Sequence, residues 1–258
     1  MTDGVLITFG CSWMYGIGVG YEEGMDAETF ESIRRDADIC GKFSYRGLLS
    51  SKFNLSNINF SEGGSSNQKQ LRRAKIFFSS AGFEKLQRQH NNIIVVWGIT
   101  STARTEMFDL ETGILTNFKY DAGVTPKISE MMVKYSYDHT NEVAQLSMEM
   151  KFWNSYFASI GVKNIWVDSF NTHDYMSPIP NLFNDNCDYR DLMSSLVVNL
   201  DMPIMDSSYH ASSWREDCDR VSTLLRSGHL DPFSMHPTKS AHRTIALMLD
   251  HEIALRLQ

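Results

Sequence analysis

Ser12 and His236, near opposite ends of the sequence, have the residue types and surroundings that nucleophilic catalysis requires. Ser12 lies in the segment GCSW (residues 10–13), directly after a short apolar run that reads as a strand. A hydroxyl at the start of a helix lies near free backbone N–H groups, which favour developing negative charge. From this loop alone, however, a plain helix N-cap is the more frequent role for such a serine.

His236 lies in the segment LDPFSMHP (residues 230–237), immediately before an amphipathic C-terminal segment. Asp231 precedes it by five residues. A histidine preceded by an aspartate can present one ring nitrogen to a serine while the carboxylate orients the other nitrogen. The alternative is a capped helix start with Pro237 at the first helical position, and the two interpretations are compatible.

Two further polar loops follow predicted strands. In EGGSSN (residues 62–67), Gly63 and Gly64 would let a backbone N–H approach a substrate oxygen closely, and Asn67 ends the segment. In WGITSTAR (residues 97–104), Thr100 follows a strand and a glycine and could donate a hydrogen bond. Local Ser/Thr turns are the alternative explanation for this loop.

The elements that would position these loops alternate between strand and helix. A continuous β-branched run at residues 92–98 predicts a strand buried on both faces of a parallel sheet. We therefore predict a doubly wound, flavodoxin-like α/β three-layer sandwich with a mostly parallel five-stranded sheet and a small hairpin insertion at residues 106–120. The other strands are expected at residues 5–10, 57–60, 163–168 and 203–206, and helices at residues 68–80, 128–160 and 237–257.

GCSW, GGSSN, WGIT and DPFSMHP, in that order, resemble the conserved blocks of the SGNH/GDSL hydrolase family across almost the whole chain, residues 1–258, taken as one domain. The resemblance implies a serine esterase that forms an acyl-enzyme at Ser12, with His236 as general base and Asp231 orienting it. It also implies an oxyanion hole built from the backbone N–H groups of Ser12 and of Gly63 or Gly64, and it implies no cofactor or metal.

The sequence departs from the family pattern at three points. Cys11 stands where the family has aspartate, and Thr100 stands where it has the oxyanion-hole asparagine, a role that Asn67 could take instead. Asp231 is five rather than three residues before His236, so a Ser–His dyad in which a backbone carbonyl orients the imidazole is an alternative.

The variant pattern is similar to SGNH-like proteins of tailed phages, which implies deacylation of glycans and a virion-associated location. A catalytically silent binding or phage structural protein of the same fold is the alternative.

Several other classes are disfavoured by the sequence. A net charge of −7 argues against a nucleic-acid binder, and no apolar run reaches membrane-spanning length. The N-terminus lacks the features of a signal peptide, so we expect cytoplasmic synthesis and free thiols. Cys11 as a nucleophile, a metal site among the histidines near residue 236, and nucleotide binding by GIGVG (residues 16–20) are weaker alternatives. The substrate, a small-molecule or glycan ester, and the oligomeric state are not specified further.

Overall fold

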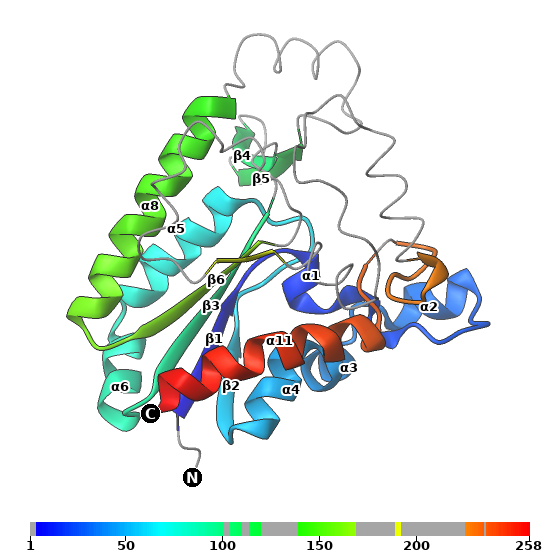
Figure 1. Ribbon diagram of the computed structural model, residues 1–258. Coiled ribbons are helices and arrows are strands. Elements are labelled where there is room, and N and C mark those ends of the chain that lie inside the picture. The colour runs from blue at the N-terminus through cyan, green and yellow to red at the C-terminus, as the bar shows by residue number, and fades with distance from the viewer. Residues whose placement is uncertain are drawn as a thin grey trace, which may run out of the picture.

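A parallel sheet of five strands forms the centre of the protein (Figure 1), seen in a computed structural model that describes residues 4–100, 104–109, 114–119, 139–168, 189–191, 225–234 and 236–258. The strand order β2-β1-β3-β6-β7 is that of flavodoxin-like doubly wound sheets, as predicted. The strands are β1 (Gly4–Phe9), β2 (Leu55–Asn59), β3 (Ile93–Ile99), β6 (Lys163–Asp168) and β7 (Tyr189–Asp191). The sequence analysis did not predict β7, and the strand that it expected at residues 203–206 lies outside the described residues.

The two central strands, β1 and β3, are buried along their whole length, as their apolar β-branched sequences predict. They pair in parallel with Val5 opposite Ile93 and Thr8 opposite Val96. Successive side chains alternate between the two faces of the sheet. Leu6 therefore joins the apolar cluster on one face, whereas Val5 joins the cluster on the other.

Helices cover both faces of the sheet and complete three layers (Figure 1). One face packs against α4 (Tyr45–Lys52) and α11 (Lys239–Leu257), and the other against α5 (Asn67–Phe78), α6 (Ala81–Gln89) and α8 (His139–Ser159). On the second face Trp97 stacks on Phe9 at 4.7 Å and on Trp166 at 4.8 Å between ring centroids. This row of rings ties three neighbouring strands together beneath α8.

Four short helices follow β1, and the sequence analysis did not predict them individually. They are α1 (Ser12–Tyr15), the 3₁₀ helix η1 (Ile17–Gly20), α2 (Ala27–Ile33) and α3 (Ala37–Phe43). Asp26 and Asp36 cap α2 and α3, accepting hydrogen bonds of 2.9 Å from the first-turn N–H groups. The predicted hairpin is present as β4 (Arg104–Asp109) paired antiparallel with β5 (Ile114–Lys119).

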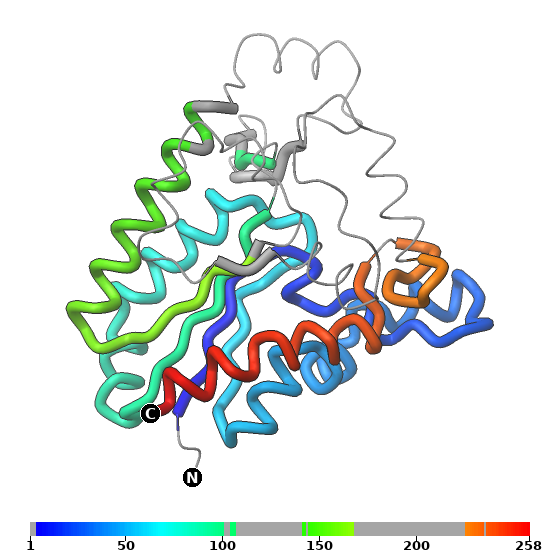
Figure 2. Tube along the Cα trace, viewed as in Figure 1, coloured from blue at the N-terminus to red at the C-terminus, as the bar shows by residue number. Residues whose placement is uncertain are grey.

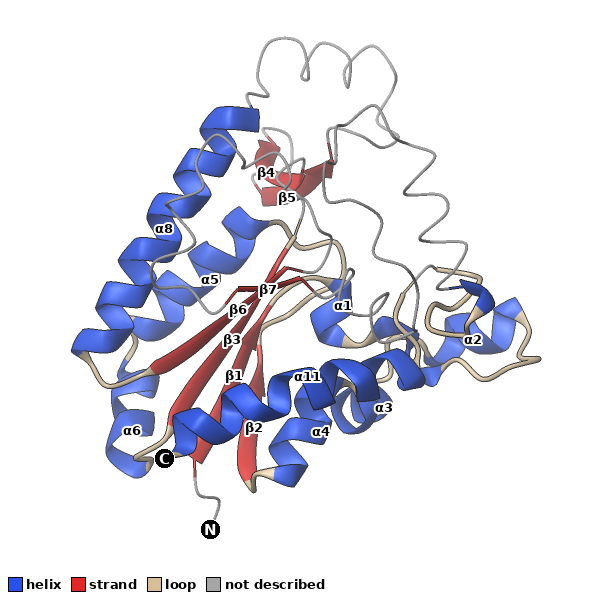
Figure 3. Ribbon diagram, in the orientation of Figure 1, coloured by secondary structure: helices blue, strands red, loops and turns tan. Residues whose placement is uncertain are grey.

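The final helix, α11, runs antiparallel to the strands and is about 28 Å long at the usual rise per residue. Its C-terminal end lies beside the start of β6, where Arg256 Nε donates to the Asn164 carbonyl oxygen at 3.3 Å. Figure 2 shows α11 ending at the same end of the sheet at which β1 begins. The residues that precede α11 therefore lie at the carboxyl end of the sheet, with the loops that follow β1 and β2 (Figure 3). None of the described helices has the length and apolar character needed to cross a membrane.

Candidate active site

Ser12 is the first residue of α1, at the point where β1 ends and the chain turns into the helix. The N-cap position is occupied by Cys11, and no side chain caps the helix. Ser12 is therefore not the N-cap residue, although that is the more frequent role of a serine in such a loop. The Ser12 side chain is largely buried, and no described residue hydrogen-bonds its hydroxyl. This hydroxyl is available for chemistry.

The loop before α11 is organised around the buried carboxylate of Asp231. One oxygen accepts the backbone N–H groups of Phe233 at 3.0 Å and Ser234 at 2.6 Å. The other accepts the His236 backbone N–H at 3.0 Å and the Ser234 hydroxyl at 2.8 Å. Asp231 therefore fixes the position of the His236 backbone, but its described contact with the imidazole runs through Ser234.

Ser234 stands between the carboxylate and the imidazole, with its Oγ 2.8 Å from His236 Nδ1. A hydroxyl has one proton to donate, and an ionised carboxylate can only accept. Since the Ser234 proton is directed to Asp231, its oxygen accepts from Nδ1–H. The proton on Nδ1 leaves the Nε2 lone pair of His236 free to act as a base. Sequence reasoning missed Ser234, although the Asp-Pro-Phe-Ser spacing is typical of an Asx turn.

The environment of His236 keeps its ring neutral. Burial, together with the positive charges of Arg34 and Arg104, lowers the pKa of His236 to about 4. The Asp231 carboxylate opposes this effect and raises the pKa. At neutral pH the imidazole is therefore in the unprotonated form that a general base requires.

Ser12 and His236 line the same cavity, which has a volume of about 410 Å³. Gly63, Gly64 and Ser234 line it as well, and Arg104 does so from the end of WGITSTAR, so all four sequence segments reach this cavity. The other described lining residues are Trp13, Ile17, Arg34 and Arg35. Asp231 lies behind Ser234 and is fully buried.

Gly18, in the segment GIGVG, allows η1 to pack against the loop that carries His236 (residues 230–237, the histidine loop). A Cβ at Gly18 would lie 2.7 Å from the His236 carbonyl oxygen and 2.4 Å from that of Pro237. Both distances are shorter than real Cβ contacts. Only glycine therefore allows this close backbone approach, which explains a glycine-rich segment that fitted no nucleotide-binding motif.

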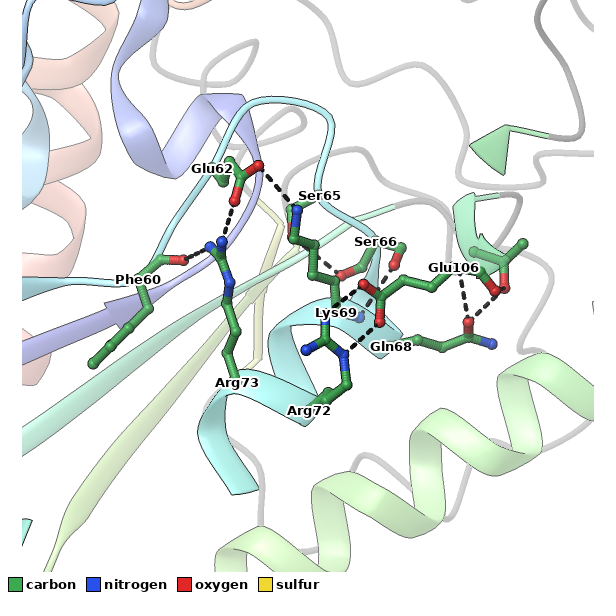
Figure 4. Close-up of polar contacts among 10 residues, drawn as sticks. Phe60, Glu62, Ser65, Ser66, Gln68, Lys69, Arg72, Arg73 and Glu106 are labelled. Atoms are coloured by element: carbon green, nitrogen blue, oxygen red, sulfur yellow. Dashed lines mark hydrogen bonds and ion pairs between the residues drawn. The ribbon is translucent and has the colours of Figure 1, made fainter. Parts of the chain in front are cut away.

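A network of ion pairs fixes the loop that carries Gly63 and Gly64 (Figure 4). Glu62 accepts from Lys69 Nζ at 2.9 Å and from Arg73, both on α5. Arg73 also donates to the Phe60 carbonyl oxygen at 2.9 Å. Gly64 has a φ of +75°, a left-handed conformation that glycine adopts without strain.

Within the described residues, no hydrogen bond uses the backbone N–H groups of Gly63 and Gly64. These groups are therefore available to a substrate oxygen in the cavity that both glycines line.

Asn67 and Thr100 bind each other rather than lining this cavity. Asn67 Nδ2 donates to the Thr100 carbonyl oxygen at 2.7 Å, and Asn67 Oδ1 accepts the Thr100 N–H at 2.9 Å. Thr100 Oγ1 is buried and has no hydrogen-bond partner among the described residues. The pair joins the start of α5 to the end of β3, and one Nδ2 hydrogen of Asn67 is not used by this pair.

The alternative reactive groups lie elsewhere. Cys11 is fully buried in the apolar cluster beneath α11, so its sulfur is not accessible to substrate. His242 is also buried, where its Nδ1 accepts the Tyr45 backbone N–H at 3.2 Å. In the part of the chain that the structure describes, no three His, Cys, Asp or Glu side chains are grouped so that they could hold a metal ion.

No protein-family profile and no protein of curated function matches the sequence. Solved structures, by contrast, are similar to this protein in fold. An acetyl xylan esterase, Est2A from Butyrivibrio proteoclasticus, aligns with 100% of this chain at 10% identity and a TM-score of 0.50. This chain spans 65% of the length of Est2A. The esterase EstA from Pseudoalteromonas sp., solved with monoethylphosphonate as inhibitor, aligns over 99% of both chains at 11% identity and a TM-score of 0.50.

A lipolytic protein of the G-D-S-L family from Desulfitobacterium hafniense is also similar, at 12% identity and a TM-score of 0.46, over 99% of this chain and 100% of that one. At such identities, structural similarity establishes the fold and leaves the chemistry to the site. The protein has the SGNH/GDSL hydrolase fold.

Proposed function

We propose that the protein is a serine ester hydrolase that works through an acyl-enzyme at Ser12. The observation that carries the proposal is the shared cavity, which brings together a serine hydroxyl with no hydrogen-bond partner among the described residues and a neutral histidine from the opposite end of the chain. Two solved structures with the same fold are esterases, which supports the reaction class. Removal of acyl groups from glycans is the finer proposal, and it rests on the family resemblance.

In the first half of the reaction, Ser12 Oγ attacks the ester carbonyl carbon while its proton moves to His236 Nε2. The carbonyl π electrons move to oxygen, and backbone N–H groups of Ser12 and of Gly63 or Gly64 stabilise the resulting oxyanion. Collapse of the tetrahedral intermediate breaks the bond to the alcohol oxygen. That oxygen takes the proton from Nε2, and the acyl group remains on Ser12.

In the second half, a water molecule attacks the acyl-enzyme and gives its proton to the same Nε2. Collapse of the second intermediate returns the proton to Ser12 Oγ and releases the acid. In both halves the imidazolium formed at His236 is stabilised through Nδ1–H, Ser234 Oγ and the Asp231 carboxylate. The complete cycle consumes one ester and one water and gives one acid and one alcohol.

Labelling with a fluorophosphonate, followed by peptide mass spectrometry, tests the proposal, because these reagents trap a base-activated serine. We expect one adduct, on Ser12, and loss of p-nitrophenyl acetate hydrolysis in proportion to labelling. Ser12→Ala should abolish both, whereas Ser159→Ala, an exposed serine on α8, should change neither.

An adduct on Cys11, or ester turnover that survives Ser12→Ala, would overturn the proposal. Failure of the intact protein to hydrolyse or react would favour the binding-protein alternative. A loss of activity on chelation that zinc restores would instead indicate a metal hydrolase.

A further inference from the structure

The cavity that holds Ser12 and His236 has a strongly positive wall. Arg34, Arg35 and Arg104 line it, and the described lining contains no carboxylate side chain. The protein as a whole carries a formal net charge of −7. The protein is acidic as a whole, so its composition does not explain why three arginines gather at this cavity.

The packing of α2 places two of these arginines at the cavity. Arg34 is the C-cap residue of α2, and Arg35 follows it. Phe30, on the same helix, is buried, and its ring centroid lies 5.7 Å from that of Phe233 in the histidine loop. Aromatic contacts between the two segments therefore hold α2 beside the loop that precedes α11 (Figure 1).

The described residues compensate the charge of Arg34 and Arg35 only in part. Glu31 pairs with Arg34 Nε at 2.6 Å, but the Glu31 side chain is 64% exposed, so water screens that ion pair. Arg35 is exposed and forms no ion pair with the described residues. Guanidinium groups bind carboxylate, sulfate and phosphate with two parallel hydrogen bonds, which lysine cannot do. The type of side chain therefore suits an oxyanion ligand.

The positive charge also acts on the catalytic base. Arg34 and Arg104 both lower the pKa of His236, so their fields reach the imidazole. A charged ligand group beside these arginines would accordingly occupy the same cavity as the ester bond.

We propose that the substrate is an anionic ester, with a carboxylate, sulfate or phosphate group bound by Arg34 and Arg35 while Ser12 attacks the carbonyl in the same cavity. This inference rests on the proposed esterase function and specifies the substrate class. A cavity lined with one sign of charge concentrates the oppositely charged substrate and speeds its association by about 10- to 1000-fold. The arginines would therefore act on substrate capture, seen in KM and kcat/KM, more than on kcat.

Paired esters of equal size test the proposal. On the acyl side we would compare p-nitrophenyl hexanoate with the monoadipate ester, which differs by a terminal carboxylate. On the alcohol side we would compare phenyl acetate with meta-carboxyphenyl acetate. The variants are Arg34→Gln with Arg35→Gln, and Arg88→Gln as control, since Arg88 is an exposed arginine on α6 at the far end of the sheet (Figure 1).

We expect the ratio of kcat/KM on the charged ester to that on its neutral partner to fall about 10- to 100-fold in the double variant on at least one side. Arg88→Gln should leave the ratio and both activities unchanged. Raising the ionic strength from about 0.05 to about 0.5 M should lower the wild-type ratio, because salt screens exposed charges. The side on which the ratio falls identifies the part of the substrate that carries the charge.

A Ser12-dependent hydrolase that shows the same ratio in wild type and double variant would overturn the inference and leave the proposed function standing. Equal losses on charged and neutral esters would also overturn it, because the arginines would then stabilise the reaction of every ester. If wild type hydrolyses none of the four esters, the proposed function fails. Calorimetric titration of adipate into Ser12→Ala, with and without the arginine changes, would then decide whether the cavity recognises anions.

Discussion

Replacing Ser234 with alanine tests whether its hydroxyl links Asp231 to His236. The change removes two hydrogen bonds of 2.8 Å, the one that Ser234 Oγ accepts from His236 Nδ1–H and the one that it donates to Asp231 Oδ2. Asp231 keeps the backbone N–H groups of Phe233, Ser234 and His236 as donors. The loop should therefore keep its conformation while the imidazole loses the partner that fixes its tautomer.

The magnitude follows from the value of one hydrogen bond to a charged group. The imidazolium exists only after Ser12 has transferred its proton, so the bond from Nδ1–H to Ser234 contributes mainly to the transition state. Such bonds contribute about 1.5–3 kcal/mol. At about 1.36 kcal/mol per factor of ten, kcat should fall about 10- to 150-fold, with little change in KM. Stability should fall by about 1–3 kcal/mol, because one donor to the buried carboxylate is lost.

Steady-state kinetics on a neutral p-nitrophenyl ester, with thermal unfolding measured in parallel, would check both values. Ser234→Thr keeps the hydroxyl and should recover most of kcat, whereas a variant that merely loosens the loop would not be rescued in this way. A folded Ser234→Ala protein with kcat within about twofold of wild type would refute the relay, because the estimated loss is at least tenfold.

Three further predictions concern His236, Gly18 and the pair Asn67 and Thr100. Because burial lowers the pKa of His236 to about 4, kcat/KM on a neutral ester should stay constant down to about pH 5 and fall to half near pH 4. A midpoint near pH 6.5, in a protein whose fold is intact by circular dichroism, would contradict the buried environment of His236. Gly18→Ala places a Cβ 2.7 Å from the His236 carbonyl oxygen and should lower kcat about 10- to 100-fold by displacing the histidine, whereas Gly41→Ala, where a Cβ meets no atom within 4 Å, should not; equal activities would show that the loop can shift freely. Asn67→Ala should destabilise the protein by about 2–6 kcal/mol, because it leaves two buried backbone groups of Thr100 unpaired. Thr100→Val removes a buried hydroxyl that has no described partner, so the variant should be as stable as the wild type. A loss of about 100- to 1000-fold in kcat would identify that hydroxyl as an oxyanion donor. If Thr100→Val and Asn67→Ala both retain kcat, backbone N–H groups alone stabilise the oxyanion.

The sequence by itself determined four strands of the sheet and the last helix, because these elements depend on local patterns of apolar residues. The β-branched run at residues 92–98 corresponds to β3, and the apolar stripe from residue 241 to residue 253 is the buried face of α11. The order of the four polar loops then brought out the family resemblance, since the loops after parallel strands meet at one edge of a sheet.

The helices between β1 and β2 could have been predicted in part. Asp26 and Asp36 are local N-cap signals, and each accepts hydrogen bonds from the first turn that follows it. The short and mostly polar segments between them carry no clear apolar period, so the pattern that revealed the longer helices was missing. The expected strand at residues 203–206 remains a prediction, since it lies outside the described residues.

Only the tertiary structure decided how the site is assembled. The sequence suggested that Asp231 orients His236, but the structure places Ser234 between the carboxylate and the imidazole. It also brings Arg34 and Arg104 to the same cavity as Ser12. Sequence spacing could not show these contacts, because each depends on how a loop turns or on how distant segments pack. A hydrogen bond or an ion pair is formed within about 3–4 Å, and that precision comes from the packed core and loops around the site.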